Sequence, residues 1–298
     1  MNNIATTEIR AKKHSRLIKS SLMKRNLEKF LSNRLALFGL ILVLVLVIVS
    51  VFAPVFTRYN PALVDASQRF LPLSFTHLLG TDNVGRDVFS RILYGGRISM
   101  FIGLVSALGA SLIGIILGCY SGYLGGKTDS VILYVWEIFS AFPQTILVLI
   151  MVGFAGRGLS NLIIIFSITG WTGVYRIVRS RILSIREEAF VECCRANGIG
   201  DFSIMFRHML PNTLGPVIVT ITLQTAGYVL AEAGLSFIGL GVESSIPTWG
   251  NIINAAKSML IIQNYPAMWL APGIAISLFV LGVNFFGDGL RDVFDPKQ

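Results

Sequence analysis

The chain has 298 residues, of which 53% are apolar and only 14% are charged, and its mean hydropathy is +0.69. A soluble globular domain carries roughly 25% charged residues, because most of its surface faces water. The composition therefore excludes a soluble globular protein and predicts an all-α polytopic membrane protein.

The first 34 residues are polar and basic, and nine of the 25 Lys and Arg residues lie between Arg10 and Arg34. A basic segment directly before an apolar run is a topology signal, so the net charge of +9 does not indicate nucleic-acid binding. Apolar residues recur among these charges, which predicts an interfacial helix on the cytoplasmic leaflet, with a disordered tail as the alternative.

Residues 35–57 carry no charge and would span about 35 Å as a helix, enough for a hydrocarbon core of about 30 Å. No small-residue cleavage site follows them, so the run reads as a retained span and not as a signal peptide. Residues 58–97 are mixed in character and are expected to be extramembrane. Five further spans are predicted in residues 98–126, 133–156, 160–176, 213–231 and 268–287.

Small residues recur at four-residue spacing in the second span, at Ala110, Gly114 and Gly118, and allow a neighbouring helix to approach closely. Pro143 predicts a kink or break in the third span. With six spans, most Lys and Arg residues fall on the inner side when both termini are cytoplasmic. We therefore expect a tail and interfacial helix over 1–34, followed by one transmembrane domain of about six helices over 35–298.

The loop between the fourth and fifth spans, residues 186–212, has a helical pattern of its own. Residues 186–197 contain no helix breaker, Gly198 permits a sharp turn, Asp201 can cap a second short helix, and Pro211 ends it. That helix carries an apolar stripe of Phe202, Met205, Phe206 and Met209. Such a stripe fits a partner's groove; the alternative is that it rests on the lipid surface or on its own bundle.

This loop resembles the cytoplasmic coupling loop of ABC importer permeases, whose pattern is Glu-Ala-Ala, three residues, Gly, nine residues, Ile, one residue, Leu-Pro. The pattern matches at Glu192, Gly198, Leu210 and Pro211. The two alanines are replaced by Cys193 and Cys194, and His208 stands at the Ile position, which is similar to the peptide and nickel branch of that family.

Two further strings resemble signatures of the second permease of dipeptide, oligopeptide and nickel importers. Residues 80–99 read GTDNVGRDVFSRILYGGRIS, and residues 232–250 begin with EAGLSFIGLG and end with PTWG. Three strings in order along the chain are far more specific than one short motif. The resemblance covers roughly residues 30–295.

The resemblance implies a permease that forms half of a pathway for di- or oligopeptides across a bacterial or archaeal cytoplasmic membrane. It implies four kinds of partner: a second homologous permease, two cytoplasmic ATPase subunits, an extracytoplasmic substrate-binding protein and the lipid bilayer. ATP and Mg would bind to the ATPase subunits, so no cofactor, metal or catalytic residue is expected in this chain. A nickel or metal-chelate importer is the alternative substrate class.

Three groups of candidate site residues follow. The ATPase-coupling group comprises Glu192, Gly198, Asp201, Phe202, Met205, Phe206, Arg207, Leu210 and Pro211. The candidate pathway or gate residues are Glu137, Pro143, Glu232 and Ser236; for the two glutamates the alternative is a helix-end position, wetted or paired with Arg. The candidate external contacts are Asp82, Arg86, Asp87 and Trp249, and the alternative for the first three is local ion pairing.

Other functions find little support. Residues 121–128 nearly match a phosphate-binding loop, but Ser121 replaces its first Gly and an apolar helix precedes it where a strand is required, so a short turn is expected. His14, His77 and His208 and the three cysteines show no metal-site spacing. A secondary transporter or channel would need mid-span charges or repeated halves, and a membrane enzyme would need clustered polar residues at one membrane face.

Overall fold

The computed structural model describes residue 25 and residues 27–294. This part of the chain consists of helices joined by turns and loops, and its one β-type pairing is an isolated antiparallel bridge between Thr81 and Asp87. Five helical segments are long and apolar enough to cross a membrane, and there are six when one bent pair of helices is taken as a single crossing. The all-α polytopic prediction is therefore confirmed.

The crossing segments are α2 (Arg34–Val51), α4 (Val88–Leu124), the bent pair α5 (Gly126–Ser140) and α6 (Gln144–Ala155), α7 (Leu159–Thr169) with α8 (Thr172–Arg186), the segment Asp201–Phe237 that ends in α11 (Leu214–Phe237), and α14 (Ala267–Phe294). Short helices connect them: α3 (Ala53–Phe56), η1 (Ala66–Gln68), α9 (Ala189–Ala196), α10 (Asp201–Ser203), α12 (Trp249–Ala255) and α13 (Met259–Asn264).

One predicted helix boundary agrees with the structure and one does not. The axes of α5 and α6 differ by 87° across residues 141–143, so the predicted break at Pro143 is confirmed. The predicted start of the second span at residue 98 is wrong, because α4 begins at Val88. Residues 88–97 were not assigned to the span because Arg91 and Arg97 are charged. Arg91 is buried, and its guanidinium donates to the Pro61 carbonyl at 3.1 Å.

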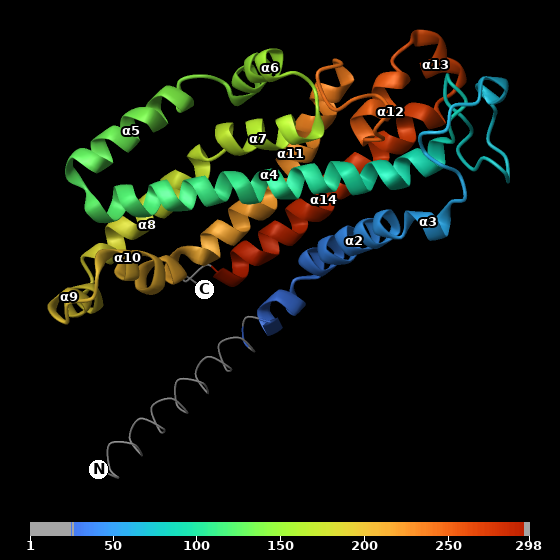
Figure 1. Cartoon of the computed structure of the whole chain (residues 1–298). Coiled ribbons are helices and arrows are strands. Elements are labelled where there is room, and N and C mark those ends of the chain that lie inside the picture. The colour runs from blue at the N-terminus through green and yellow to red at the C-terminus, as the bar shows by residue number, and fades with distance from the viewer. Residues whose placement is uncertain (1–24, 26, 295–298) are drawn as a thin grey trace.

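Helix α4 lies at the centre of the bundle and packs against α2, α7, α8 and α11 (Figure 1). Its small residues make this contact close: a methyl group added at Gly114 would lie 2.8 Å from the Trp171 carbonyl oxygen, and one at Gly118 would lie 2.8 Å from Cβ of Val178. The predicted small-residue face is therefore the α4–α8 interface.

The two ends of the bundle differ in content (Figure 1). One end carries α9 and α10, the start of α2 and the last turn of α14, whereas the other carries residues 57–87, α12 and α13. Residues 27 and 294 therefore lie at the same end, as an even number of crossings requires. We call these the α9 end and the α12 end.

Most of the predicted interfacial helix lies outside the described residues. Residues 27–32 are helical and lead into α2, whose first turn is capped by the Asn33 side chain, which accepts from the amides of Leu35 and Ala36. Phe30 is buried against Phe286 of α14, with ring centroids 5.9 Å apart, while Leu27 and Leu31 are exposed.

Candidate functional site

The coupling loop, residues 186–212, projects from the α9 end of the bundle (Figure 1). The chain leaves α8 at Arg186, forms α9, and reverses at Gly198, whose φ of +72° belongs to the left-handed region that favours glycine. The predicted sharp turn at Gly198 is confirmed. No heavy atom beyond its neighbours lies within 4 Å of a Cβ built there, so the backbone angle alone calls for glycine.

The helix after the turn does not end at Pro211. From α10 it continues as a π-helical segment, η2 (Ile204–Met209), then a 3₁₀ turn, η3 (Leu210–Thr213), and then α11. Leu210 donates its amide to the Met205 carbonyl, five residues back, and Pro211 has no N–H to continue this pattern. The hydrogen-bonding pattern changes at Pro211, but the helix continues beyond it. The prediction that the helix ends at Pro211 is therefore wrong.

Asp201 does not cap α10, contrary to the prediction: the residue before that helix is Gly200 and no side chain caps it. Instead the Asp201 carboxylate accepts a 2.6 Å hydrogen bond from the Tyr123 hydroxyl at the end of α4. The Arg195 guanidinium lies over the Tyr123 ring and donates to the same hydroxyl at 3.5 Å, which raises the pKa of Arg195. These bonds fasten both sides of the Gly198 turn to α4.

Most of the apolar stripe packs against the helices of this chain. Met205 and Met209 are buried with Ile204 in a core that includes residues of α4 and α8, and Phe206 packs on Tyr120. Met205 therefore cannot be a docking contact in this conformation, and that part of the prediction is wrong. The exposed residues of the predicted coupling group are Glu192, Gly198, Asp201, Phe202, Arg207 and Pro211, and Leu210 is half-buried.

The predicted external contacts are internal to the α12 end. Asp82 accepts from Arg86 Nε at 2.7 Å and from two backbone amides, and Asp87 caps α4 through the Ser90 amide and also bonds His77. Trp249 is 1% exposed, and its indole donates to the Ile92 carbonyl at 3.0 Å. Asp82, Asp87 and Trp249 are buried and cannot contact another protein directly, whereas Arg86 is half-buried and its role as an external contact stays a prediction. The local ion pairing of Asp82 with Arg86 and of Asp87 with His77 is confirmed.

Glu232 and Ser236 lie inside the bundle, where α11 meets α4 and α12. Glu232 is fully buried and accepts hydrogen bonds from Ser236 Oγ at 2.7 Å and from Ser99 Oγ of α4 at 3.1 Å. Ser99 Oγ in turn accepts the Trp249 amide of α12 at 3.1 Å. The alternative of a wetted or Arg-paired helix end is wrong for Glu232, because its side chain is buried and its partners are two serine hydroxyls. A role of Glu232 and Ser236 in the pathway or gate stays a prediction. Glu137, by contrast, is exposed near the end of α5.

A cavity of about 570 Å³ lies beneath the α5–α6 bend, and we call it the elbow cavity. Its polar groups are neutral: Gln144 and Thr145 follow Pro143 at the start of α6, and Gln224 and Tyr228 come from α11. Gln224 donates to the Gly170 carbonyl at 3.1 Å, but its buried Oε1 has no partner among the described residues. Polar side chains at membrane depth usually face a cavity or a partner.

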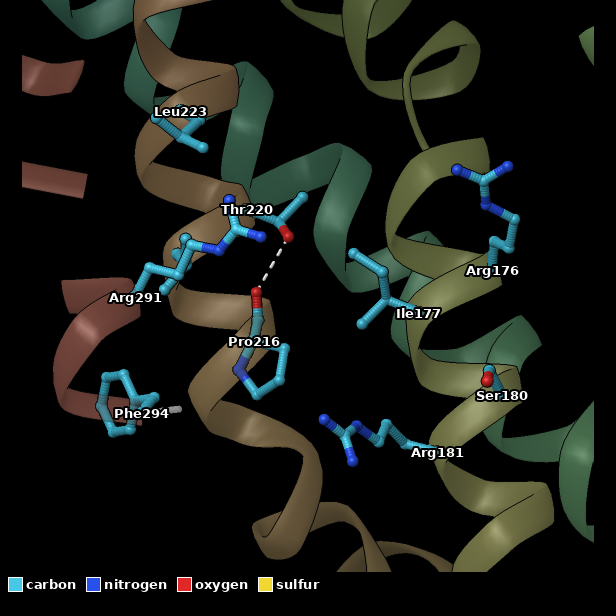
Figure 2. A pocket seen from close by; sticks show the side chains of 10 residues that line it. Arg176, Ile177, Ser180, Arg181, Pro216, Thr220, Leu223, Arg291 and Phe294 are labelled. Atoms are coloured by element: carbon cyan, nitrogen blue, oxygen red, sulfur yellow. Dashed lines mark hydrogen bonds between the residues drawn. The ribbon is translucent and has the colours of Figure 1, made fainter. Parts of the chain in front are cut away.

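A second cavity, of about 700 Å³, lies toward the α9 end between α8, α11 and α14, and we call it the arginine cavity (Figure 2). Figure 2 shows Arg181 of α8 and Arg291 of α14 extending from opposite sides toward α11, with Arg176 farther along α8. Ile177, Pro216, Val219, Leu223 and Phe294 form its apolar wall.

Both cavities open on one face of α11. Its lining residues recur every three or four positions, at Pro216, Thr220, Leu223, Gly227, Ala231, Gly234 and Ile238. Residues with this spacing share one side of a helix, so the cavities follow each other along the length of α11. We call this side the α11 face.

The sequence interpretation missed the residues that line these cavities. Gln144 directly after Pro143, and Gln224 within an apolar run, were the available signals, because an uncharged polar side chain at that depth needs a partner or a cavity. The arginines were counted only as topology signals. Residues 121–128 join α4 to α5 through a turn at Gly125, as expected.

Two protein-family models match this chain. A family model described as "Binding-protein-dependent transport system inner membrane component" matches residues 114–298, and one described as "N-terminal TM domain of oligopeptide transport permease C" matches residues 21–72. The chain belongs to the family of binding-protein-dependent transport system inner membrane components. The coupling loop and the α11 face are thus features of a transport-system membrane component.

Named relatives span nearly the whole chain. A putative peptide permease protein of Brucella suis is 38% identical over 92% of this chain and 91% of its own length. The dipeptide transport system permease protein DppC of Alkalihalophilus pseudofirmus is 39% identical over 89% and 87%, and the oligopeptide transport system permease protein OppC of Bacillus subtilis is 36% identical over 93% and 90%. Among solved structures, an inward-facing MetNI methionine ABC transporter matches with a TM-score of 0.56 and 20% identity, covering 69% of this chain and 97% of that chain, which supports the fold.

Proposed function

We propose that this chain is the membrane-spanning permease subunit of an ATP-binding-cassette importer and that its α11 face forms half of the pathway. The observation that carries the proposal is the succession of two cavities along one helix that continues without a break into the coupling loop. A second, homologous permease would close the pathway, because each cavity is open on one side of this chain.

Peptides are the proposed substrate class, because the relatives named above are dipeptide, oligopeptide and putative peptide permeases. These names do not favour a nickel or metal-chelate substrate. The elbow cavity agrees with peptides in its chemistry: the amide and hydroxyl groups of Gln144, Gln224 and Tyr228 can hydrogen-bond a peptide backbone whatever its side chains.

The α9 end is the proposed docking surface for two ATPase subunits, which would bind ATP and Mg and face the cytoplasm. The residues of α9 are mostly exposed, and Phe202, an apolar side chain with 66% exposure, lies just beyond the turn. The α12 end would then face an extracytoplasmic substrate-binding protein. Both termini would be cytoplasmic, because the described chain begins and ends at the α9 end.

Native Cys193 provides a direct test of docking. It is exposed on α9, whereas Cys119 is buried within α4, and Cys194→Ala removes the remaining half-buried thiol. In inside-out membrane vesicles, a membrane-impermeant maleimide should label Cys193 rapidly when the ATPase subunits have been stripped. Restoring those subunits should slow the labelling by about tenfold, because a docked surface excludes the reagent.

Equal labelling rates with and without the ATPase subunits would contradict docking at α9. The assembled complex should also drive ATP-dependent uptake of a tripeptide such as trialanine into proteoliposomes when the binding protein is present. Absence of peptide uptake by a fully assembled complex would contradict the peptide assignment while leaving the docking result intact.

A further inference from the structure

The arginine cavity contains cationic side chains that have no acidic partner within residues 27–294. Arg176, Arg181 and Arg291 form no ion pair among the described residues, and no carboxylate lines the cavity. Arg179 of the same helix shows the contrast, because its guanidinium forms a bidentate pair with Asp129, with both N–O distances at 2.7 Å.

The charge is also unevenly distributed along the α11 face. The elbow cavity is lined by neutral polar and apolar groups only, and the arginines are confined to the cavity nearer the α9 end. A solute that passes from the α12 end to the α9 end therefore meets a strongly positive environment only in the last part of its path. Such a field attracts anionic groups and repels ammonium groups.

Resting on the proposed function, we infer that the arginine cavity is a carboxylate-binding site for the C-terminal carboxylate of the transported peptide at the inner end of the pathway. The guanidinium of arginine presents paired N–H donors whose geometry matches a carboxylate. Arg181 and Arg291 line the same cavity and extend toward α11 from opposite sides (Figure 2), which fits an anion held between them. The apolar wall of Ile177, Val219 and Leu223 accommodates the side chains that precede the terminus.

A carboxylate is the one anionic group that every unmodified linear peptide has, whatever its length and composition. A site for it would therefore act on all peptides without selecting among side chains. The phosphate of an anionic lipid has the same chemistry and is the competing occupant that an experiment has to separate.

Arginine modification tests the site without requiring transport. The purified, assembled complex is treated with phenylglyoxal, and modification of each arginine is followed by peptide mass spectrometry. Millimolar trialanine should slow modification of Arg181 and Arg291 by about threefold or more, as a charge-assisted contact at an open site predicts, while trialanine amide should not. Arg34 is exposed at the same end but outside the cavity, and its modification rate should not change.

A second set of samples separates two-sided binding from unspecific effects. Arg291→Gln should reduce the protection of Arg181, whereas Arg34→Gln should leave it unchanged. The proposal is overturned if trialanine gives no protection, if its amide protects equally, or if Arg34 is protected to the same degree. Protection by phosphatidylglycerol vesicles but not by trialanine would overturn it in favour of a lipid phosphate. Because these results do not depend on uptake, they stand apart from a failure of the proposed peptide transport.

Discussion

Two buried acidic side chains of this bundle have hydroxyl, amide or imidazole partners and no Lys or Arg partner among the described residues. Glu232 is held by Ser99 and Ser236, and Asp87 by the Ser90 amide and by His77. If one member of such a buried hydrogen bond is removed, the other is left unpaired and out of contact with water, which costs free energy. These residues therefore hold helices α4, α11 and α12 together at the α12 end.

Replacement of Glu232 should reveal this role as a loss of stability. Glu232→Ala should lower the free energy of unfolding by roughly 2–4 kcal/mol, because it leaves a cavity and two unpaired hydroxyls. Glu232→Gln keeps the volume and one acceptor and should cost less. Thermal unfolding of the detergent-solubilised protein measures the difference, with exposed Glu243→Ala as a matched control that should change little. Equal effects of the Ala substitutions at Glu232 and Glu243 would contradict the role.

Gly198 should be sensitive to backbone geometry and not to side-chain volume. Gly198→Val places a β-branched residue at a φ of +72°, at a cost of about 1–2 kcal/mol or more, and should reduce ATP-driven uptake at least tenfold while insertion and assembly persist. Gly198→Asn, whose side chain tolerates this conformation, should keep most of the activity. Uptake by the Val variant at the wild-type rate would show that the turn is not required.

Residue-scale prediction from the sequence succeeded where backbone chemistry decides, and failed where burial decides. Glycine at position 198 is dictated by local geometry, so the turn could be predicted. The burial of Trp249, Asp82 and Glu232 depends on long-range packing; the Trp249 amide, for example, bonds Ser99, which is 150 residues away in the chain. No local pattern distinguishes such a residue from one on the surface.

Some glycines in the helices are required for close packing and others are not. A glycine beside open space shows the effect of helix propensity alone, so it can serve as the control for a glycine at a helix contact. Gly114 and Gly153 both lie within helices, but a Cβ at Gly114 would lie 2.8 Å from a carbonyl oxygen of the neighbouring segment, whereas one at Gly153 would meet nothing within 4 Å. The two positions thus form a matched pair for testing how closely α4 and α8 pack.

Gly114→Ala should destabilise the protein by about 1–3 kcal/mol, because the backbones must separate to admit a methyl group. Gly153→Ala should be neutral or stabilising by up to about 1 kcal/mol, since alanine favours a helix. Thermal unfolding in the same detergent compares them. A Gly114→Ala variant as stable as Gly153→Ala would mean that the close α4–α8 contact is not maintained in the membrane.

At the scale of elements, hydropathy predicted the existence of every crossing but not its limits. Pro143 correctly marked the break between α5 and α6, because a missing N–H and a rigid ring act locally. The early start of α4 at Val88 was missed because a charged residue such as Arg91 indicates a loop in a hydropathy pattern. Only the structure shows that Arg91 is buried and hydrogen-bonded to the Pro61 carbonyl. The passage of the helix through Pro211 needed a π-helical segment, which has no sequence signature.

The molecule as a whole is polarised, with the coupling loop at one end and an irregular, well-bonded segment at the other. In intact cells, a thiol introduced by Phe75→Cys should react with an impermeant maleimide, because Phe75 is fully exposed at the α12 end. Native Cys193 should react only in inside-out vesicles. The reverse pattern would invert the proposed orientation, and labelling of both positions from one side would contradict an even number of crossings.

The whole-molecule charge pattern has a magnitude that matters for an importer. A peptide carboxylate held in the arginine cavity would be attracted by each nearby guanidinium. One guanidinium about 7 Å away contributes on the order of 2 kcal/mol at an effective dielectric constant of about 20. Two or three arginines at the inner end therefore attract a carboxylate together. The sequence alone showed Arg176 and Arg181 as part of a positive loop and Arg291 as part of the C-terminal tail.

The unbroken run from Asp201 to Phe237 has a mechanical consequence. At 1.5 Å per residue it is about 55 Å long, and Glu232 ties its far end to Ser99 of α4. With that end acting as a pivot, a tilt of about 5° would sweep the residues beside the Gly198 turn through roughly 5 Å while barely shifting the pivot. A push on α9 would therefore reshape the arginine cavity more than the elbow cavity, opening or closing the exit ahead of the entrance.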